Sequence, residues 1–334
     1  MLSTTFNNVI HRVENTYQTL ACTGAALVIF RDNELQVERY WGKQSAEENA
    51  RPIQADTKFH IASCRKSYIA FAVAYALHHG LIQSLDDEIS TYLPLAQQKE
   101  IYGGTTLRHL VTHSHGLIER NGEVEREFPA GTSWAYRGIN VKLISEIIQF
   151  TTNKTIAELL NDEVFAPCQL IETNWYNSFD HTFVDVIGKE NDKHWSVSLN
   201  IDGSQMNMYT SARELAQWGL LHLNNGSLNG QQVVDANIVK LATTIQNPAY
   251  TDIDLPENGI FWFVKGSQAN KSEIGALVPN DAYQILGYTT VTLLVIPSEN
   301  IVAVRAFNSV GNPEGYDYLK DVRAFGDAVM LDLQ

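Results

Sequence analysis

Apolar residues recur at helical spacing near the beginning of the chain, which predicts an amphipathic helix. The apolar face of this helix consists of Leu2, Phe6, Val9, Val13, Tyr17 and Leu20. Two runs typical of β-strands follow at residues 24–30 and 34–41, and they flank a short polar turn at residues 31–33. We therefore expect a β-hairpin directly after the first helix.

The middle of the chain, from about residue 82 to 245, has mainly helical patterns. Before it, residues 69–77 are only aliphatic, alanine or aromatic, which predicts a helix that is buried nearly all round and stopped by Gly80. A later helix is expected to begin at Ser211, with Glu214 completing a capping box. Another helix has an apolar face made of Ile139, Leu143, Ile144, Ile147 and Ile148.

Strand patterns return toward the end of the chain. Residues 260–264 form an aromatic-rich run, and residues 291–296 and 301–307 flank a turn and predict a second hairpin. A last helix is expected over about residues 316–331. Strands near both ends with helices between them predict an α/β fold of the mixed α+β type, in which an antiparallel sheet from both termini is flanked by helices.

The mainly helical segment would be an insert in this sheet. We expect residues 1–60 together with 250–334 to form an α/β sheet domain, and residues 61–249 to form a mainly helical domain. A chain of 334 residues is long enough to bury a core of that size.

The net charge and the cysteines exclude several classes of partner and of bound metal. The net charge of −14 argues against a nucleic acid or an anionic membrane as partner, because both attract basic patches. The three cysteines, Cys22, Cys64 and Cys168, are odd in number and widely spaced, so they predict neither a disulfide framework nor a zinc site. The first residues lack the pattern of a secretory signal, and no apolar stretch approaches the roughly 20 residues that span a bilayer. We expect a cytoplasmic protein.

Candidate chemistry begins at Ser63, which lies three residues before Lys66 at the start of the apolar run. Positions i and i+3 share one face of a helix, so the two side chains can meet. A buried lysine can lose its proton at neutral pH and accept one from a serine hydroxyl. A bare S-x-x-K pattern is common, and the alternative interpretation is a helix-capping serine followed by a solvated lysine.

Several further segments favour the catalytic interpretation, because in order and spacing they resemble one family. The chain resembles the serine β-lactamase and penicillin-binding-protein superfamily, in particular its class C-like esterase and amidase branch. The segments that carry the resemblance are residues 24–30, 56–63, 107–117, 129–136, 210–215 and 225–230. The resemblance covers roughly residues 20 to 310.

This resemblance implies a β-lactamase/transpeptidase-like fold with the active site at the junction of the two domains. Ser63 would be the nucleophile, Lys66 its partner, and Tyr136 the residue that shuttles the proton. Which of Lys66 and Tyr136 is the general base stays open at this point. The activity would be hydrolysis of a small-molecule ester or amide through an acyl-enzyme, without a metal or an organic cofactor.

The same resemblance places a second oxyanion donor on a strand at residues 283–287. Ile285 and Gly287 are the candidate oxyanion or substrate-binding residues of that strand. Trp134 is a further candidate for substrate binding, because it lies two residues before Tyr136. The backbone N–H of Ser63 would be the first donor.

The H-T-S-G-L box differs from the family pattern in having His115 in place of the usual serine. Two other departures bear on the substrate. Gly138 occupies the place of the asparagine in Y-x-N, with Asn140 nearby in a different register. Residues 282–287 lack the cation of the K-T-G strand, which would bind a substrate carboxylate. An uncharged ester or amide is therefore favoured over a β-lactam or a D-alanyl peptide.

Two alternatives to the hydrolase remain from the sequence. The chain could be a non-catalytic ligand-binding homologue with a degenerate site, or a true β-lactamase or D-alanyl peptidase. The oligomeric state is not predicted.

Other polar clusters have simpler interpretations. His109, His113 and His115 have a spacing that a metal could use, but no acidic or cysteine ligand is close in sequence, so no metal site is expected. Cys64 follows the nucleophile and is expected to pack in the core. The acidic run Glu123, Glu125 and Glu127 is interpreted as a solvated loop.

Overall fold

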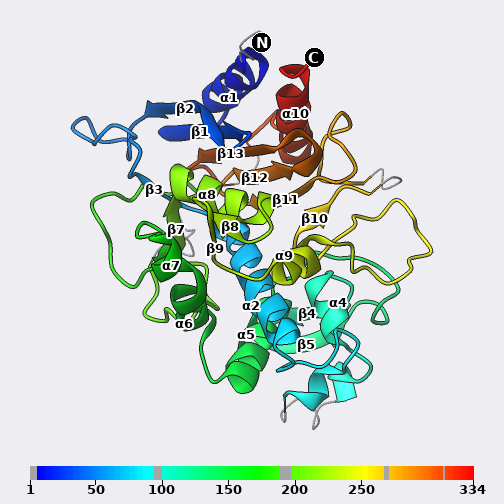
Figure 1. Cartoon of the computed structure of the whole chain (residues 1–334). Helices are drawn as coiled ribbons and strands as arrows, with labels where there is room; N and C mark the ends of the chain where they lie inside the picture. Colours follow the sequence, from blue (N-terminus) through cyan, green and yellow to red (C-terminus); the bar gives the residue numbers. More distant parts are fainter. Residues whose placement is uncertain (1–5, 94–99, 189–196, 267–270, 311–312) are drawn as a thin grey trace.

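The computed structural model describes residues 6–93, 100–188, 197–266, 271–310 and 313–334. Its centre is a six-stranded antiparallel sheet with the strand order β10-β11-β12-β13-β1-β2. Figure 1 shows that strands from the two ends of the chain lie side by side in it. The strands are β1 Gly24–Arg31, β2 Glu34–Gly42, β10 Phe263–Val264, β11 Tyr283–Gly287, β12 Val291–Ile296 and β13 Ile301–Phe307. Both predicted hairpins are therefore present, and the sheet joins the two termini as expected.

Helices cover both faces of this sheet. Helices α1 (Asn7–Thr19) and α10 (Tyr318–Leu331) pack against each other on one face, and α8 (Ala212–Leu223) packs on the other. Leu27 therefore belongs to the apolar cluster of α1 and α10, whereas its neighbour Val28 belongs to the cluster that contains α8. A strand that is buried on both faces explains why the run 24–30 is apolar without alternation.

Helix α2 (Lys66–His78) lies in the middle of the other half of the molecule (Figure 1). It packs against α5 (Ile139–Thr152), α6 (Ile156–Leu160) and α9 (Ala236–Thr243), which explains why it is apolar nearly all round. Gly80 ends this region with a φ of +68°, as predicted. The shorter helical elements are α4 Leu107–Val111, α7 Ala166–Cys168, η1 Ala62–Arg65, η2 Ile89–Thr91, η3 Glu100–Tyr102, η4 Asn161–Phe165 and η5 Pro297–Glu299.

The acidic run is solvent-exposed, as predicted, but it is not a loop. Glu123 and Glu125 lie on β5 (Glu123–Arg126), which forms a hairpin with β4 (Leu117–Arg120) that turns at Gly122, whose φ is +81°. Glu123 and Glu125 alternate with the less exposed Val124 along β5, which is the period of a strand. The other small strands are β3 Lys58–His60, β6 Asn174–Trp175, β7 Met208–Ser211, β8 Ser227–Leu228 and β9 Gln231–Gln232.

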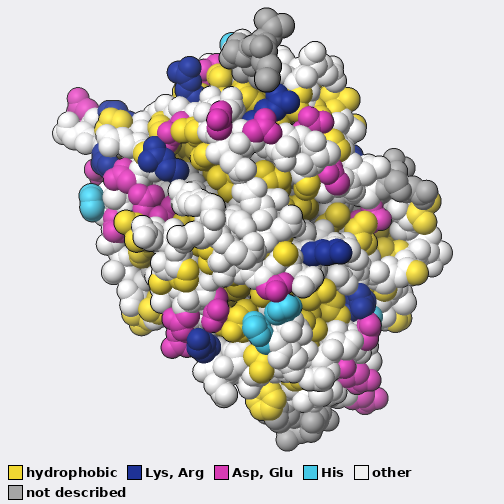
Figure 2. Space-filling model, in the orientation of Figure 1, with side chains coloured by type: hydrophobic (Ala, Val, Ile, Leu, Met, Phe, Trp, Pro, Cys, Tyr) yellow, Lys and Arg dark blue, Asp and Glu magenta, His cyan; other side chains and the backbone are white. Residues whose placement is uncertain are grey.

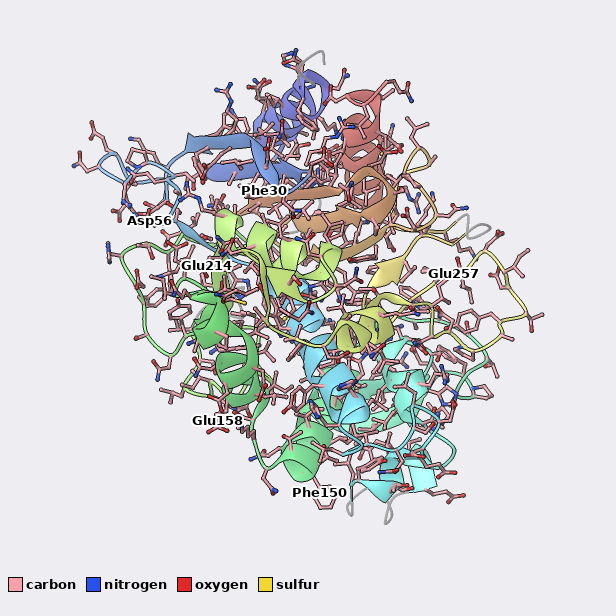
Figure 3. The ribbon with its side chains drawn as sticks, in the orientation of Figure 1. Phe30, Asp56, Phe150, Glu158, Glu214 and Glu257 are labelled. Atoms are coloured by element: carbon pink, nitrogen blue, oxygen red, sulfur yellow. The ribbon has the colours of Figure 1, made fainter. Side chains whose placement is uncertain are left out.

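Two other local predictions were correct only in part. Ser211 caps α8 by accepting a hydrogen bond from the Glu214 backbone, but the Glu214 carboxylate does not complete a capping box. It accepts hydrogen bonds from the backbone of Ile171 and Glu172, at 2.8 and 3.0 Å, and so ties α8 to the segment after α7 (Figure 3). The aromatic-rich run 260–264 is a strand only at its end, because Phe261 has a φ of +61°.

The surface carries charges of both signs. On the face seen in Figure 2, acidic and basic side chains are interspersed with apolar ones. Within the described ranges, no helix combines the length and the apolarity that crossing a bilayer requires.

Candidate active site

A tight turn before α2 holds Ser63. The sequence predicts Ser63 on the helix itself, whereas the structure places it in the 3-10 turn η1, one turn ahead of α2. Ala62 precedes it with a φ of +47°, a conformation that residues with a side chain rarely adopt. The Ala62 N–H donates to Nδ1 of His60 at 3.2 Å, which helps to hold this turn. Strained backbone of this kind is often found at functional sites.

The three predicted catalytic residues lie together. Nζ of Lys66 is 3.2 Å from Oγ of Ser63 and donates to the Tyr136 hydroxyl at 2.6 Å. Lys66 is only 3% exposed, so its amine lies between the serine and the tyrosine with little water around it. The spacing from Ser63 to Lys66 was visible in the sequence, but Tyr136 is 70 residues further along the chain from Lys66.

Burial shifts the pKa values of Lys66 and Tyr136 in opposite directions. It lowers the pKa of Lys66 well below its usual range, and the neighbouring Arg65 guanidinium acts in the same direction. Burial also raises the pKa of Tyr136 to about 12, against a smaller opposite effect of the Ser63 hydroxyl and of Arg65. The Tyr136 residue is 36% exposed because it lines an open pocket, while its hydroxyl faces Lys66. The site therefore favours a neutral amine beside a protonated phenol.

A second layer of polar groups supports Tyr136. The imidazole of His113 stacks on the tyrosine ring, with 4.5 Å between the ring centroids and an angle of 25°. Nδ2 of Asn140 donates to Nδ1 of His113 at 3.2 Å and to the carbonyl of Leu110 at 2.9 Å. Asn140 thus positions the histidine behind the tyrosine, and Gly138 is the residue before helix α5.

The three neighbouring histidines use their Nδ1 atoms in different hydrogen bonds. Nδ1 of His109 accepts from the N–H of Thr106 at 3.1 Å, and Nδ1 of His115 accepts from the N–H of Leu117 at 2.9 Å. In the part of the chain that the structure describes, no group of three or more His, Cys, Asp or Glu side chains is placed to hold a metal ion.

A pocket of about 180 Å³ opens beside Ser63. Its lining is mostly aromatic and aliphatic, with one carboxyl group. The lining residues are Ser63, Trp134, Tyr136, Phe263, Glu273, Leu286, Tyr288, Tyr318 and Leu319. Trp134 was predicted here, and its Nε1 donates to Oδ1 of Asn258 at 2.9 Å. Sequence reasoning missed Glu273 and Tyr318, because neither belongs to a motif and both come from segments far from Ser63.

Strand β11 passes directly against the turn of Ser63. Of the two candidates on this strand, Ile285 has its side chain in the core, at 1% exposure, and it is the next residue, Leu286, that lines the pocket. Cys64 is buried in the core, as predicted. Its Sγ is 3.6 Å from the carbonyl oxygen of Ile285, and this contact links the Ser63 turn to β11. Gly287 lies where a Cβ atom would be 2.3 Å from the carbonyl oxygen of Ile61.

This close approach leads to a prediction for Gly287→Ala. The added methyl group would push β11 away from the turn that holds Ser63, so we expect a loss of about 1–3 kcal/mol in the free energy of unfolding. Any activity that depends on Ser63 should fall with it. Urea unfolding checks the stability, with Gly138→Ala as the control, because a Cβ atom at Gly138 meets nothing within 4 Å. Equal stability of the two variants would contradict the prediction.

Comparisons with known proteins identify the family. Residues 9–327 match the family model described as Beta-lactamase, and the chain belongs to this family of hydrolases. An uncharacterized protein of Alkalihalophilus pseudofirmus is 49% identical over 333 residues, which cover 100% of this chain and 98% of that protein. A class C beta-lactamase structure has a TM-score of 0.78 at 14% identity and covers 98% of this chain and 96% of its own. The structure of EstCE1, a hydrolase with promiscuous acyltransferase activity, has a TM-score of 0.74 at 14% identity, covering 97% and 99%. The predicted superfamily and fold class are confirmed.

Proposed function

We propose that this protein is a serine hydrolase that cleaves an ester or a small amide through an acyl-enzyme on Ser63. The observation that carries the proposal is the position of the Lys66 amine, 3.2 Å from Oγ of Ser63 and 2.6 Å from the Tyr136 hydroxyl, beside an apolar pocket. A nucleophile within hydrogen-bond reach of a base, which is itself held by a third group, is the arrangement that activates a serine.

Acylation begins with proton transfer. Neutral Nζ of Lys66 takes the hydroxyl proton of Ser63 while Oγ bonds to the carbonyl carbon of the substrate. The tetrahedral intermediate then expels the alcohol or amine, which receives a proton from Tyr136, and Tyr136 regains a proton from the Lys66 ammonium. The lowered pKa of Lys66 and the raised pKa of Tyr136 favour these roles, with the lysine as base and the phenol as acid.

Deacylation runs in reverse with water as the nucleophile. A water molecule passes a proton through Tyr136 to Lys66 and attacks the acyl carbon, and Oγ of Ser63 leaves with that proton. The oxyanion of both intermediates would bind the backbone N–H of Ser63 and a donor at the end of β11 near Gly287. The position of Gly287, where a Cβ atom would lie 2.3 Å from the carbonyl oxygen of Ile61, supports this place for the second donor.

The strand that borders the pocket favours a substrate without a carboxylate. Gln284 and Ile285 are buried, at 1% exposure each, and Leu286 presents an aliphatic side chain to the pocket. The Gln284 amide is engaged with the carbonyl oxygen of Glu273 at 2.7 Å. These side chains offer no cation to a penicillin carboxylate or a peptide C-terminus, so an ester or a small amide fits them better.

The test compares two chromogenic substrates with and without the nucleophile. We expect p-nitrophenyl butyrate to be hydrolysed by the wild-type protein and not by Ser63→Ala, because Oγ of Ser63 is the acceptor of the acyl group in the proposed cycle. Nitrocefin, which carries a carboxylate, should be a poor substrate. Intact-protein mass spectrometry on rapidly quenched samples should find the butyryl adduct on wild type only.

The other outcomes separate the alternatives. Turnover of nitrocefin that depends on Ser63 and exceeds that of the ester would make the protein a β-lactamase. Equal hydrolysis of the ester by wild type and Ser63→Ala would contradict an acyl-enzyme on Ser63. Saturable binding of the ester without any hydrolysis would favour a ligand-binding protein.

A further inference from the structure

The pocket beside Ser63 contains one carboxyl group whose position no catalytic role explains. Glu273 is 8% exposed and lines the pocket together with Ser63 and Tyr136. Its Oε2 atom is buried and has no hydrogen-bond partner among the described residues. A buried carboxylate that lacks a partner is costly, so such a group requires an explanation.

The surroundings of Glu273 do not compensate for its charge. Burial raises the pKa of this carboxyl to about 7, and the Arg323 guanidinium opposes that effect only in part. Nε of Arg323 donates instead to the carbonyl oxygen of Ser272 at 2.7 Å, and among the described residues no hydrogen bond joins Arg323 to Oε2 of Glu273. A ligand that brings a positive charge would supply the missing partner.

Hydrogen bonds hold the backbone around Glu273, and the buried side chain starts from this fixed main chain. The carbonyl oxygen of Glu273 accepts a hydrogen bond from Nε2 of Gln284 on β11 at 2.7 Å. Oγ of Ser272 accepts from the N–H of Ile274 at 3.1 Å, which closes a turn around the residue. The main chain of Glu273 is therefore anchored to the same strand that passes the nucleophile.

The remaining walls of the pocket also suit a cation. Trp134, Tyr136, Phe263, Tyr288 and Tyr318 supply aromatic rings to the lining of the same pocket. Aromatic faces attract ammonium groups, and a desolvated carboxylate forms a strong charge-assisted hydrogen bond with one. The charge of Glu273 also reaches the two nearby phenols, because it raises the pKa of Tyr136 and of Tyr318.

We propose that Glu273 determines specificity by binding a protonated amine of the substrate, so that the pocket selects esters or amides that carry an ammonium group. This inference rests on the proposed function only in that the bound molecule is cleaved at Ser63. The recognition itself is a property of the pocket and can be measured without turnover.

The first experiment measures binding with three probes of one size. Benzylamine, benzyl alcohol and benzoate differ mainly in charge, and their affinities for the wild-type protein are compared by isothermal titration calorimetry at pH 8.5. At this pH Glu273 is ionised. We expect benzylamine to bind at least about tenfold more tightly than benzyl alcohol, and benzoate to bind weakest.

Two matched variants assign the preference to one carboxyl. Glu273→Gln keeps the shape of the side chain and should remove the preference for the amine. Glu257→Gln is the control, because Glu257 is also a partly buried carboxyl with a raised pKa, but it lies on the loop before β10 and outside the pocket lining (Figure 3). Equal affinity of the wild-type protein for benzylamine and benzyl alcohol would overturn the proposal, and so would a preference that survives in Glu273→Gln.

A second experiment separates this inference from the proposed function. The p-nitrophenyl esters of 6-aminohexanoate and heptanoate have chains of equal length that end in an ammonium or a methyl group. We expect kcat/KM to favour the amino ester in the wild-type protein and in Glu257→Gln, and to favour neither in Glu273→Gln. Selective amine binding without hydrolysis of either ester would contradict the hydrolase but support the role of Glu273. Hydrolysis of both esters at one rate would support the hydrolase but contradict the role of Glu273.

Discussion

Lys66→Met is expected to reduce turnover of p-nitrophenyl butyrate by about 10²–10⁴-fold, which is the range that a positioned general base contributes. The same change should leave the protein as stable as before or more stable, because methionine fills the space of a lysine that is 3% exposed and removes an amine whose charge is costly there. Steady-state kinetics check the loss of turnover, and urea unfolding of the same preparation checks the stability. A stable variant that keeps more than a tenth of the wild-type rate would contradict the role of Lys66.

The pH dependence of the rate tests the same assignment. Below its pKa the Lys66 amine is protonated and cannot accept the Ser63 proton, so the rate should rise with pH through a pKa well below 10.5. Tyr136→Phe should keep this rise while lowering the rate at every pH, because the base remains and the acid is lost. Lys66→Arg retains a charge but cannot act as a base at these pH values, and it should be as inactive as Lys66→Met.

The protein is also expected to unfold in mild acid, above about pH 4. Burial lowers the pKa of His60, His115 and His222 to about 4 in the folded protein, and that of His113 well below its usual range. In the unfolded chain these imidazoles titrate near pH 6.5, so between pH 6.5 and 4 the unfolded state binds more protons and stability falls as the pH falls. The Glu273 carboxyl, with its pKa raised to about 7, acts in the opposite direction over part of this window.

The size of the effect follows from the count of groups. Five histidines with a lowered pKa, His109 included, oppose Glu273 and the upward shifts of Asp185, Glu214 and Glu257. Each proton of net difference is worth about 1.4 kcal/mol for each pH unit, so a net difference of about two protons over two pH units is a large part of the free energy of unfolding of a typical domain. Urea unfolding at several pH values between 7.5 and 4.5 measures the slope.

A single substitution shows whether the buried histidines are responsible. In His222→Gln the free energy of unfolding should depend less steeply on pH, by the equivalent of about one proton. The reason is that His222 is 2% exposed and its Nδ1 contacts the Trp218 carbonyl oxygen at 2.9 Å. His181→Gln is the control, since its side chain is 85% exposed in the folded protein. An unchanged slope in His222→Gln would contradict this account.

Patterns within one element were predictable from the sequence. The hairpins of β1 with β2 and of β12 with β13, the buried helix α2 and the turn at Gly80 all follow from periodicity and turn residues. Ser63 and Lys66 are three residues apart, so their contact is also local. Tyr136 could be assigned only by resemblance to a family motif.

The errors come from positions where local pattern does not determine tertiary contact. Leu286 was not among the candidates, although successive residues of a strand face opposite sides and the side chain of Leu286, rather than that of Ile285, lines the pocket. The oxyanion role of Ile285 would use its backbone and stays a prediction. Glu214 fits a capping box in sequence, yet its carboxylate finds the backbone N–H groups after α7. Glu273 has no sequence signal, because its meaning arises only when its segment folds beside Ser63.

The sheet that joins both ends of the chain has a consequence for synthesis. Strand β1 is made early, but its partner β13 (Ile301–Phe307) leaves the ribosome only after most of the chain. Until then one edge of β1 is open, and β11, which borders the Ser63 turn, is missing as well. Contacts at such sequence separation form slowly. The α2 region can thus become compact during translation, whereas a working nucleophile must await the last strands, so premature termination is expected to yield chains that are inert as well as unstable.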